Sequence, residues 1–397
     1  MDAVGEHGEI DASKEKQLAD VYNGYTYFLE NDILIAKITP CFENGKGAIA
    51  RGLKNGVGFG TTEFHVLRPL QGVSERWVFY LTKCDSFRKI GGSEMLGAGG
   101  QKRLPEDFIR NLRIGIPSFA EQEKIAAFLD WKTGQIDALI AKKQALIEKL
   151  KQKRLAVITQ AVTKGLDPAA PMRDSGISWL GKVPASWSVK RLRYCAGMVT
   201  SGSRGWAEFF SESGALFLRI TNLDRESISL KLDDLQRVEP PDGAEGARTL
   251  TKAGDLLISI TADLGSVAVI PPGFESAYIS QHLSLVRLDS DDIDPNWIAN
   301  SILSLAGKYQ LNTAGYGGTK IQLSLSDIKD ITFCHPSSLD EQQSVLRAVK
   351  QEIERNNKLI ELAEDAVARL NEYRIALITA ATTGKIDVRN VNIGVAG

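Results

Sequence analysis

The clearest pattern of hydrophobic and polar positions lies in two long segments, residues 120–165 and 340–385. In each segment apolar residues recur at positions a, d and e of a heptad, which predicts a long amphipathic helix. The first segment carries Ile136, Leu139, Ile140, Leu146, Ile147, Leu150 and Val157 on this stripe, and the second carries Leu359, Ile360, Ala363, Ala366, Val367, Leu370 and Leu377. Because one helix cannot bury such a stripe alone, each helix needs a partner.

The two segments are copies of one another. Aligning Glu121 with Glu341 gives an offset of 220 residues (341 − 121), and this offset places RLAVITQAVT on RIALITAATT with six of ten positions identical. Tandem copies that pair through equivalent surfaces are related by a pseudo-two-fold axis, which makes the helices antiparallel. We therefore predict an antiparallel coiled coil; two unrelated surface helices are the alternative. The residues predicted to form the interface of the helix pair or of a partner are Ile136, Ile140, Ile147, Leu150, Leu359, Val367 and Leu370.

The segments before each long helix share one order of predicted elements. In the first half these are strands at 32–38, 47–52 and 62–69, a helix at 75–90, a glycine-rich loop at 97–103 and a strand at 108–117. The second half repeats strands at 255–261 and 282–288, a helix at 295–310, a glycine loop at 315–320 and a closing strand at 323–336. This predicts an α+β fold with two α/β domains separated by two long antiparallel helices. The predicted segments are 1–118, 119–165, 166–338 and 339–397, with a Pro/Gly/Ser-rich connector near 165–192.

The two predicted domains differ at their beginnings. Trp187 opens the second domain, and the 220-residue offset would place its counterpart about 33 residues before Met1. Two hypotheses follow: the true start lies upstream of Met1, or the first domain is naturally shortened.

Composition limits the classes of function. The chain has 397 residues, 43% hydrophobic and 24% charged, with 48 Lys and Arg against 49 Asp and Glu. The net charge of the chain is therefore close to zero and does not indicate a nucleic-acid partner. The run at 142–154 is locally basic, and either a solvated helix face or a phosphate or partner contact accounts for it. Four cysteines without paired spacing indicate reduced thiols and a cytoplasmic protein, and neither a secretory signal nor a membrane span is predicted.

No catalytic constellation is present in the sequence. There is no phosphate loop, no dinucleotide fingerprint after a strand, and no Asn/Asp-Pro-Pro-aromatic motif typical of adenine methyltransferases. The four histidines are His7, His65, His282 and His335, and none lies at metal-ligand spacing from another. For His282, at a strand entrance, a core or turn role is favoured over a base contact. We expect a protein without an active site, metal or cofactor of its own.

Candidate DNA contacts lie on polar loops beside the strands, with a plain solvent loop or a structural turn as the alternative for each. In the first domain they are Lys37, Thr39, Lys46, Gln101, Lys102 and Arg103. In the second domain they are Thr200, Ser201, Ser203, Arg204, Thr261, Asp263, Tyr316, Thr319, Lys320 and Gln322. The two glycine loops match at an offset of 218, and their glycines and lysines would let the backbone approach a phosphate.

Together, SGISWLGKVPASWSVKRL, the glycine loop followed by P-x3-4-EQ, and the repeated helices resemble the DNA-specificity subunit of a type I restriction-modification system. The resemblance covers essentially the whole chain. It implies two target recognition domains that each read one half of a bipartite double-stranded DNA sequence. It also implies two methyltransferase subunits and motor-nuclease subunits as partners, which would bind S-adenosylmethionine, ATP and Mg²⁺. The missing start puts readout of the first half-site in doubt, and a shortened protein-interaction scaffold is the alternative.

The predicted helices suit this function in length. Residues 135–162 at about 1.5 Å per residue span roughly 42 Å, comparable to the ~34–36 Å between half-sites one DNA turn apart. Helix length would then set the spacer between the half-sites. Because the chain is nearly neutral, we expect weak DNA binding alone and tight binding in the complex.

Overall fold

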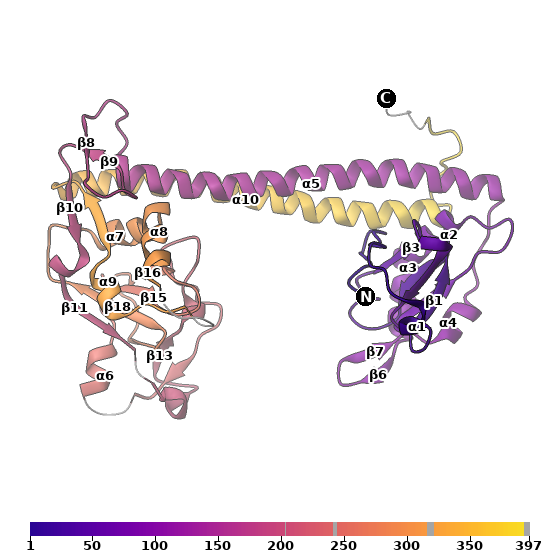
Figure 1. The fold of residues 1–397 in the computed structure, drawn as a ribbon, viewed down its shortest axis with the longest axis horizontal. Helices are drawn as coiled ribbons and strands as arrows, with labels where there is room; N and C mark the ends of the chain where they lie inside the picture. Colours follow the sequence, from indigo (N-terminus) through magenta and orange to yellow (C-terminus); the bar gives the residue numbers. More distant parts are fainter. Residues whose placement is uncertain (203, 241–243, 316–320, 393–397) are drawn as a thin grey trace. The chain divides into compact units, whose positions relative to one another are not determined.

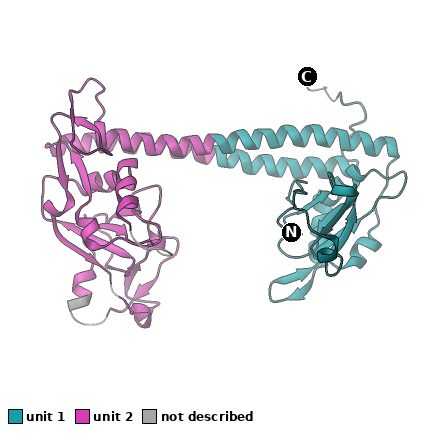
Figure 2. Ribbon diagram, in the orientation of Figure 1, with its two compact units in different colours: residues 1–145, 363–397 teal, residues 146–362 magenta. Residues whose placement is uncertain are grey.

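The computed structural model describes residues 1–202, 204–240, 244–315 and 321–392. The chain divides into two compact units (Figure 2). Unit 1 contains residues 1–145 and 363–397, and unit 2 contains residues 146–362.

Two long helices are the largest elements, as the heptad pattern predicts (Figure 1). Helix α5 (Phe119–Lys164) has 46 residues and α10 (Leu339–Thr382) has 44. In each unit, one end of α5 lies with the opposite end of α10, which is the arrangement of an antiparallel pair. The predicted fold class, mixed α+β with two domains joined by long helices, is confirmed.

The side chains that are buried along the two long helices form a seam. This seam contains fewer residues than the predicted apolar stripe. Ile136 and Ile140 are buried in unit 1, and Ile147, Leu150 and Ile360 are buried in unit 2. Val367 and Leu370 are partly buried against the core of unit 1.

Leu359 does not belong to the buried seam, contrary to expectation, because 49% of it is exposed. Leu139 and Leu146 are also exposed, and each of these three precedes a buried isoleucine by one residue. One residue turns an α-helix by about 100°, so only one member of each adjacent pair faces the partner helix.

Polar contacts join the helices at equivalent positions. In unit 1, Arg374 Nε donates to Asp137 Oδ1 (3.0 Å), and in unit 2, Arg154 Nη1 donates to Asn357 Oδ1 (3.0 Å). The two pairs are related by the 220-residue offset. The two arginines are buried, whereas Asp137 is partly exposed and Asn357 is exposed. Because each arginine needs its partner on the other helix, the contacts favour one register of the pair.

Unit 1 contains a three-stranded antiparallel sheet of order β3-β2-β5. Its elements before α5 are α1 (Leu18–Val21), β1 (Thr26–Leu29), β2 (Ile33–Ala36), β3 (Gly47–Ile49), β4 (Val57–Gly60), β5 (Phe64–Leu67), α2 (Glu75–Lys83), α3 (Asp85–Ser93), β6 (Leu96–Ala98), β7 (Gln101–Arg103) and α4 (Glu106–Asn111). Strand β1 pairs with β4, and β6 pairs with β7.

Unit 2 contains two four-stranded sheets, β11-β18-β15-β16 and β12-β14-β13-β17. Its first strands are β8 (Met172–Asp174), β9 (Lys182–Pro184), β10 (Ser188–Arg191), β11 (Ala196–Ser201), β12 (Phe210–Ser211), β13 (Ala215–Leu218) and β14 (Arg237–Val238). After these come α6 (Ala244–Thr249), β15 (Leu256–Ser259), β16 (Val267–Val269), β17 (Ala277–Ile279), β18 (Leu283–Leu288), α7 (Pro295–Leu303), α8 (Leu305–Ala314), α9 (Leu325–Lys329) and β19 (Thr332–His335).

The core sheets of the two units share a framework. Strand β2 corresponds to β15, and β5 corresponds to β18. In both units an aspartate just before the first of these strands contacts an arginine near the end of the second. Arg68 Nε donates to Asp32 Oδ1 (2.7 Å), and Arg287 Nε donates to Asp255 Oδ1 (2.8 Å). Both aspartates are 1% exposed. Strand β18 has β11 as a second neighbour, whereas β5 pairs with one strand in the part of the chain that the structure describes.

Each unit is fixed to the long helices by repeated contacts. The Gln122 side chain accepts from Ser74 N–H (2.8 Å), and the Gln342 side chain accepts from Asp294 N–H (2.9 Å). Ser74 and Asp294 are the N-caps of α2 and α7, so these glutamines secure the start of a domain helix.

A second repeated contact uses threonines near the C-terminal ends of the long helices. Asp85 N–H at the start of α3 donates to Thr379 Oγ1, and Leu305 N–H at the start of α8 donates to Thr159 Oγ1, both at 2.9 Å. Within unit 1, the domain that precedes α5 therefore packs on the C-terminal part of α10. Within unit 2, the domain that precedes α10 packs on the C-terminal part of α5.

Four predicted elements differ in the structure. The helix predicted at 295–310 is divided into α7 and α8 at Ser304. The segment 108–117 is not a strand, because α4 occupies Glu106–Asn111 and Phe108, Ile109 and Leu112 pack on the core with helical spacing. The helix predicted at 75–90 is divided into α2 and α3 at Cys84. The closing segment 323–336 begins with α9, which Ser324 caps, before β19.

Candidate nucleic-acid interface

In unit 1 the predicted contacts converge where β2 ends. Ala36 N–H donates to Lys46 O (3.0 Å), Lys37 N–H to Glu63 O (2.9 Å), and Thr39 N–H to Lys102 O (2.9 Å). These backbone bonds bring three separate chain segments to one end of the sheet. Lys37, Thr39 and Lys46 are each partly exposed there.

The predicted glycine loop is a hairpin of β6 and β7. Gly99 and Gly100 have φ of 63° and 80°, which suits the two-residue turn of a hairpin and explains why glycines stand here. Thr39 Oγ1 donates to Gly100 O (2.8 Å) and accepts from Lys102 N–H (3.0 Å), so this hydroxyl holds the hairpin against the sheet. Gln101, Lys102 and Arg103 are exposed.

Arg103 forms a two-point ion pair with Glu63 at this end of unit 1. Its Nε lies 3.0 Å from Glu63 Oε2, and its Nη2 lies 2.9 Å from Glu63 Oε1. The Arg103 hydrogen bond lowers the pKa of Glu63 despite partial burial, and Glu63 raises the pKa of Arg103. The pair is therefore ionised at neutral pH.

Unit 2 builds the same sheet end with different side chains. Ser259 N–H donates to Ser266 O (2.9 Å), Ile260 N–H to His282 O (3.0 Å), and Leu323 N–H to Ile260 O (2.9 Å). Thr261 forms a β-bridge with Gln322, and Thr261 Oγ1 lies 2.9 Å from His282 Nδ1. The predicted residues Thr261 and Gln322 are thus brought together, and both His282 and Gln322 are exposed.

Asp263 has a structural role in its turn. Its carboxylate accepts from Ser266 Oγ (2.6 Å) and from Arg225 Nε (2.9 Å). With both contacts made inside the unit, the turn interpretation of Asp263 is favoured over a cytosine contact. Arg225, whose side chain is 75% exposed, is the more accessible group of this pair.

Two predicted contacts are not on a loop. Thr200 and Ser201 lie in β11, paired with Leu285 and Ser284 of β18. Thr200 is 6% exposed and its hydroxyl accepts from Arg248, so it is directed inward. Arg204 follows this strand and is exposed. Ser203, Tyr316, Thr319 and Lys320 lie outside the described residues.

Glu63 is a site residue that the sequence analysis missed, and His282 is one that it set aside. Both stand immediately before the strand that pairs with β2 or β15, and both accept the equivalent backbone hydrogen bond. Aligning EFHVLRP with HLSLVRL would have placed them at the same position.

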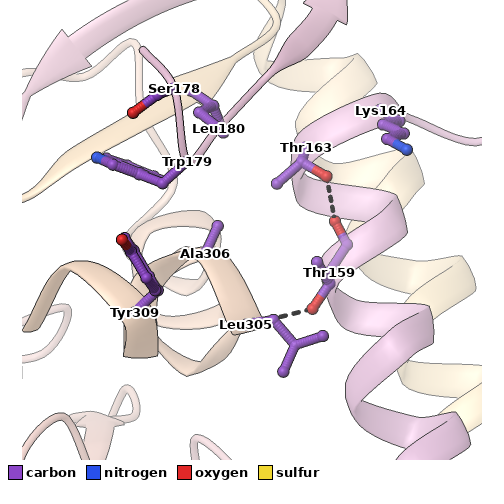
Figure 3. Close-up of a pocket in the computed structure, with 9 residues that line it drawn as sticks. All are labelled: Thr159, Thr163, Lys164, Ser178, Trp179, Leu180, Leu305, Ala306 and Tyr309. Carbon is purple, nitrogen blue, oxygen red and sulfur yellow. Dashed lines mark hydrogen bonds between the residues drawn. The ribbon is translucent and has the colours of Figure 1, made fainter. Parts of the chain in front are cut away.

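Unit 2 also contains a groove with a cavity volume of about 580 Å³ (Figure 3). It lies between the end of α5, the segment 178–180 and the start of α8, and it is lined by Thr159, Thr163, Lys164, Ser178, Trp179, Leu180, Leu305, Ala306 and Tyr309. None of these residues is an acid, histidine or cysteine. The groove therefore offers a contact surface of hydroxyl, apolar and aromatic groups with one lysine.

The described ranges contain no cluster of three potential metal ligands and no helix able to span a membrane. Burial raises the pKa of the Cys195 thiol to about 11 and that of Cys334 to about 12, so neither forms a thiolate readily at neutral pH.

The fold and its polar sheet ends define a class of protein: two related α/β domains on one pair of long helices, each presenting its own set of hydrogen-bonding side chains. Residues 9–152 match the family model described as the type I restriction modification DNA specificity domain. This match covers the first domain and part of α5, and the resemblance to type I specificity subunits is confirmed.

Individual relatives agree with this family. The type I restriction enzyme EcoAI specificity subunit of Escherichia coli is 50% identical over 121 residues, which are 30% of this chain and 20% of that protein. The StySPI specificity subunit of Salmonella potsdam is 23% identical over 324 residues, which are 81% of this chain and 67% of that protein. The matched part of the chain thus spans about a fifth of the length of the EcoAI specificity subunit.

A solved structure shares the fold. It is titled as the structural basis of complex assembly and conformational transition of the type I R-M system, and it matches with a TM-score of 0.71 and 16% identity. The match covers 92% of this chain and 85% of the other.

Proposed function

We propose that this chain is the non-catalytic DNA-recognition subunit of a type I restriction-modification complex. The observation that carries this proposal is the duplication: one backbone framework occurs twice and presents different polar side chains at the same sheet end. Two related domains with different reading groups suit a bipartite, asymmetric DNA target.

The paired long helices would serve as the scaffold. Helix α5, with 46 residues at about 1.5 Å each, is roughly 69 Å long, which is ample for setting the spacing of two half-sites. We propose that two methyltransferase subunits dock on the exposed faces of the helices, where Leu139, Leu146 and Leu359 are accessible. Motor-nuclease subunits would complete the assembly.

The chemistry would reside in the partners. S-adenosylmethionine, ATP and Mg²⁺ would bind to the methyltransferase and motor subunits, and the target adenine would be flipped into a methyltransferase pocket. A cytoplasmic location remains part of the proposal.

Co-expression with a type I methyltransferase subunit, followed by genome-wide mapping of methylated adenines, tests this function. We expect a stable complex and one bipartite motif that is absent without this chain. A complex that forms without directing methylation to any motif would contradict DNA recognition.

The second candidate is a protein-interaction scaffold without intact bipartite recognition. It is favoured by the smaller core sheet of unit 1, which has three strands where unit 2 has four. In that case the complex would form, and the mapped motif would contain one half-site or none.

A further inference from the structure

Three positions at the sheet ends are equivalent in the backbone of both units. Ile260 N–H bonds to His282 O as Lys37 N–H bonds to Glu63 O. Thr261 bridges Gln322 as Ile38 bridges Arg103. The equivalent positions are therefore Ile38 and Thr261, Glu63 and His282, and Arg103 and Gln322.

Side chains at these positions differ, although the framework around them matches. Unit 1 presents a carboxylate and a guanidinium where unit 2 presents an imidazole and an amide. The Asp–Arg pairs at the other end of the same strands are alike in both units. The Asp–Arg pair is therefore shared by the two units, whereas the side chains at the sheet end differ and are of types that suit base readout.

Arg103 is held with one edge of its guanidinium occupied. Glu63 accepts from Nε and Nη2, and Nη1 makes no hydrogen bond to another described residue. The side chain is 47% exposed. The Nη1–Nη2 edge therefore keeps two parallel N–H donors, which match the O6 and N7 acceptors of guanine in the major groove.

We propose that Arg103, positioned by Glu63, reads a guanine in the first half-site and that Gln322 is the equivalent reading residue in the second. This inference rests on the proposed function. Gln322 carries the amide that pairs with adenine N6 and N7, so the two equivalent positions select different bases. Glu63 is a positioning residue, because it orients the guanidinium and does not itself donate to a base.

The test uses Arg103→Gln in the methyltransferase complex, with methylated adenines mapped as above. One base of one half-site should change or become degenerate, with guanine discrimination reduced on the order of 10- to 100-fold. The other half-site should stay unchanged. Conversely, Gln322→Arg should change one base of the other half-site only.

Three further variants control this experiment. Arg103→Lys keeps the charge and loses the fork, so it should lose guanine discrimination while the complex still methylates. Glu63→Gln should weaken the preference for the same base, which a merely structural role would not do. Arg51→Gln removes another exposed, glutamate-paired arginine of unit 1 and should leave the motif unchanged.

The outcomes separate the two levels of inference. If the wild-type chain directs methylation to no motif, the proposed function is wrong. A wild-type motif that Arg103→Gln leaves intact, or weakens equally at every base, overturns the reading role of Arg103.

Discussion

At the scale of single residues, the repeated Asp–Arg pairs show how each unit stabilises its core sheet. Asp32 receives hydrogen bonds from Arg68 and from Leu29 N–H (2.7 Å). Burial alone would raise the pKa of Asp32, but these hydrogen bonds and the Arg68 charge lower it below its usual value. Asp255 is held in the same way by Arg287 and by Lys252 N–H.

Replacing Asp32 with Asn should destabilise unit 1 in a pH-dependent manner. A lowered folded pKa means that the carboxylate stabilises the fold above its unfolded pKa, near 4, and that this contribution is lost as the pH falls through the folded value. Because Arg68 is 55% exposed, we expect a loss of about 1–3 kcal/mol at pH 7 and a shallower decline below pH 4.

Hydrogen exchange of unit 1 amides across this pH range measures the effect. Asp255→Asn is the matched control and should reduce protection in unit 2 instead. Equal protection in the wild-type chain and in Asp32→Asn would contradict the role of this pair.

Asn356 is a second informative residue. It is 1% exposed, and its side-chain amide has no hydrogen-bond partner among the described residues. The equivalent residue of the first copy is Ile136, which is also buried. A polar residue in a helix seam fixes register at a cost in stability.

Asn356→Ile should therefore raise the free energy of unfolding by about 1–2 kcal/mol, since it removes an unsatisfied buried amide. Urea denaturation followed by circular dichroism measures this change, and Ile136→Asn should act in the opposite direction. A loss of stability in Asn356→Ile would mean that the amide makes a contact that stabilises the fold.

At the scale of elements, the helix pair depends on a narrow seam. Leu150 is 8% exposed, whereas Leu139 of the same helix is 44% exposed. The apolar positions of the heptad are therefore unequal, and substitutions at them should separate folding from partner binding.

Leu150→Asp should lower the free energy of unfolding by roughly 3 kcal/mol or more, because it places a carboxylate in the seam. Leu139→Asp should cost less than about 1 kcal/mol. Thermal unfolding compares the two variants, and co-purification with the methyltransferase subunit tests whether Leu139→Asp weakens docking alone. Similar melting temperatures for both would show that the helices do not pair through this seam.

At the scale of the whole molecule, the balance of 48 basic and 49 acidic residues determines how the chain meets DNA. Several arginines near the sheet ends are already paired with acids, including Arg103 with Glu63 and Arg225 with Asp263. Such pairs offer little charge for the phosphate backbone.

The isolated chain should consequently bind its target weakly, with micromolar or weaker affinity at physiological salt, and the complex should bind far more tightly. Each phosphate contact adds about −0.9 to the slope of log K against log salt, so a shallow slope is expected for the chain alone. Fluorescence anisotropy at several salt concentrations measures both. Nanomolar binding by the purified chain would contradict this expectation.

Sequence alone determined the features that repeat along the chain. The 220-residue offset and the heptad pattern predicted two long helices and two related domains, because periodic burial leaves a local record in the order of residues. The same comparison located Thr261, Gln322 and the β6–β7 hairpin among the candidate contacts. The 218-residue offset between the glycine loops also places Arg103 one residue from Gln322.

Only the tertiary structure decided which side chains meet. The Arg103–Glu63 pair joins residues 40 positions apart, and Thr200 is buried because β18 and Arg248 pack against it. Phe108, Ile109 and Leu112 form a helical face that a short apolar run does not distinguish from a strand. These features depend on the path of the chain between distant segments, and local periodicity carries no information about that path.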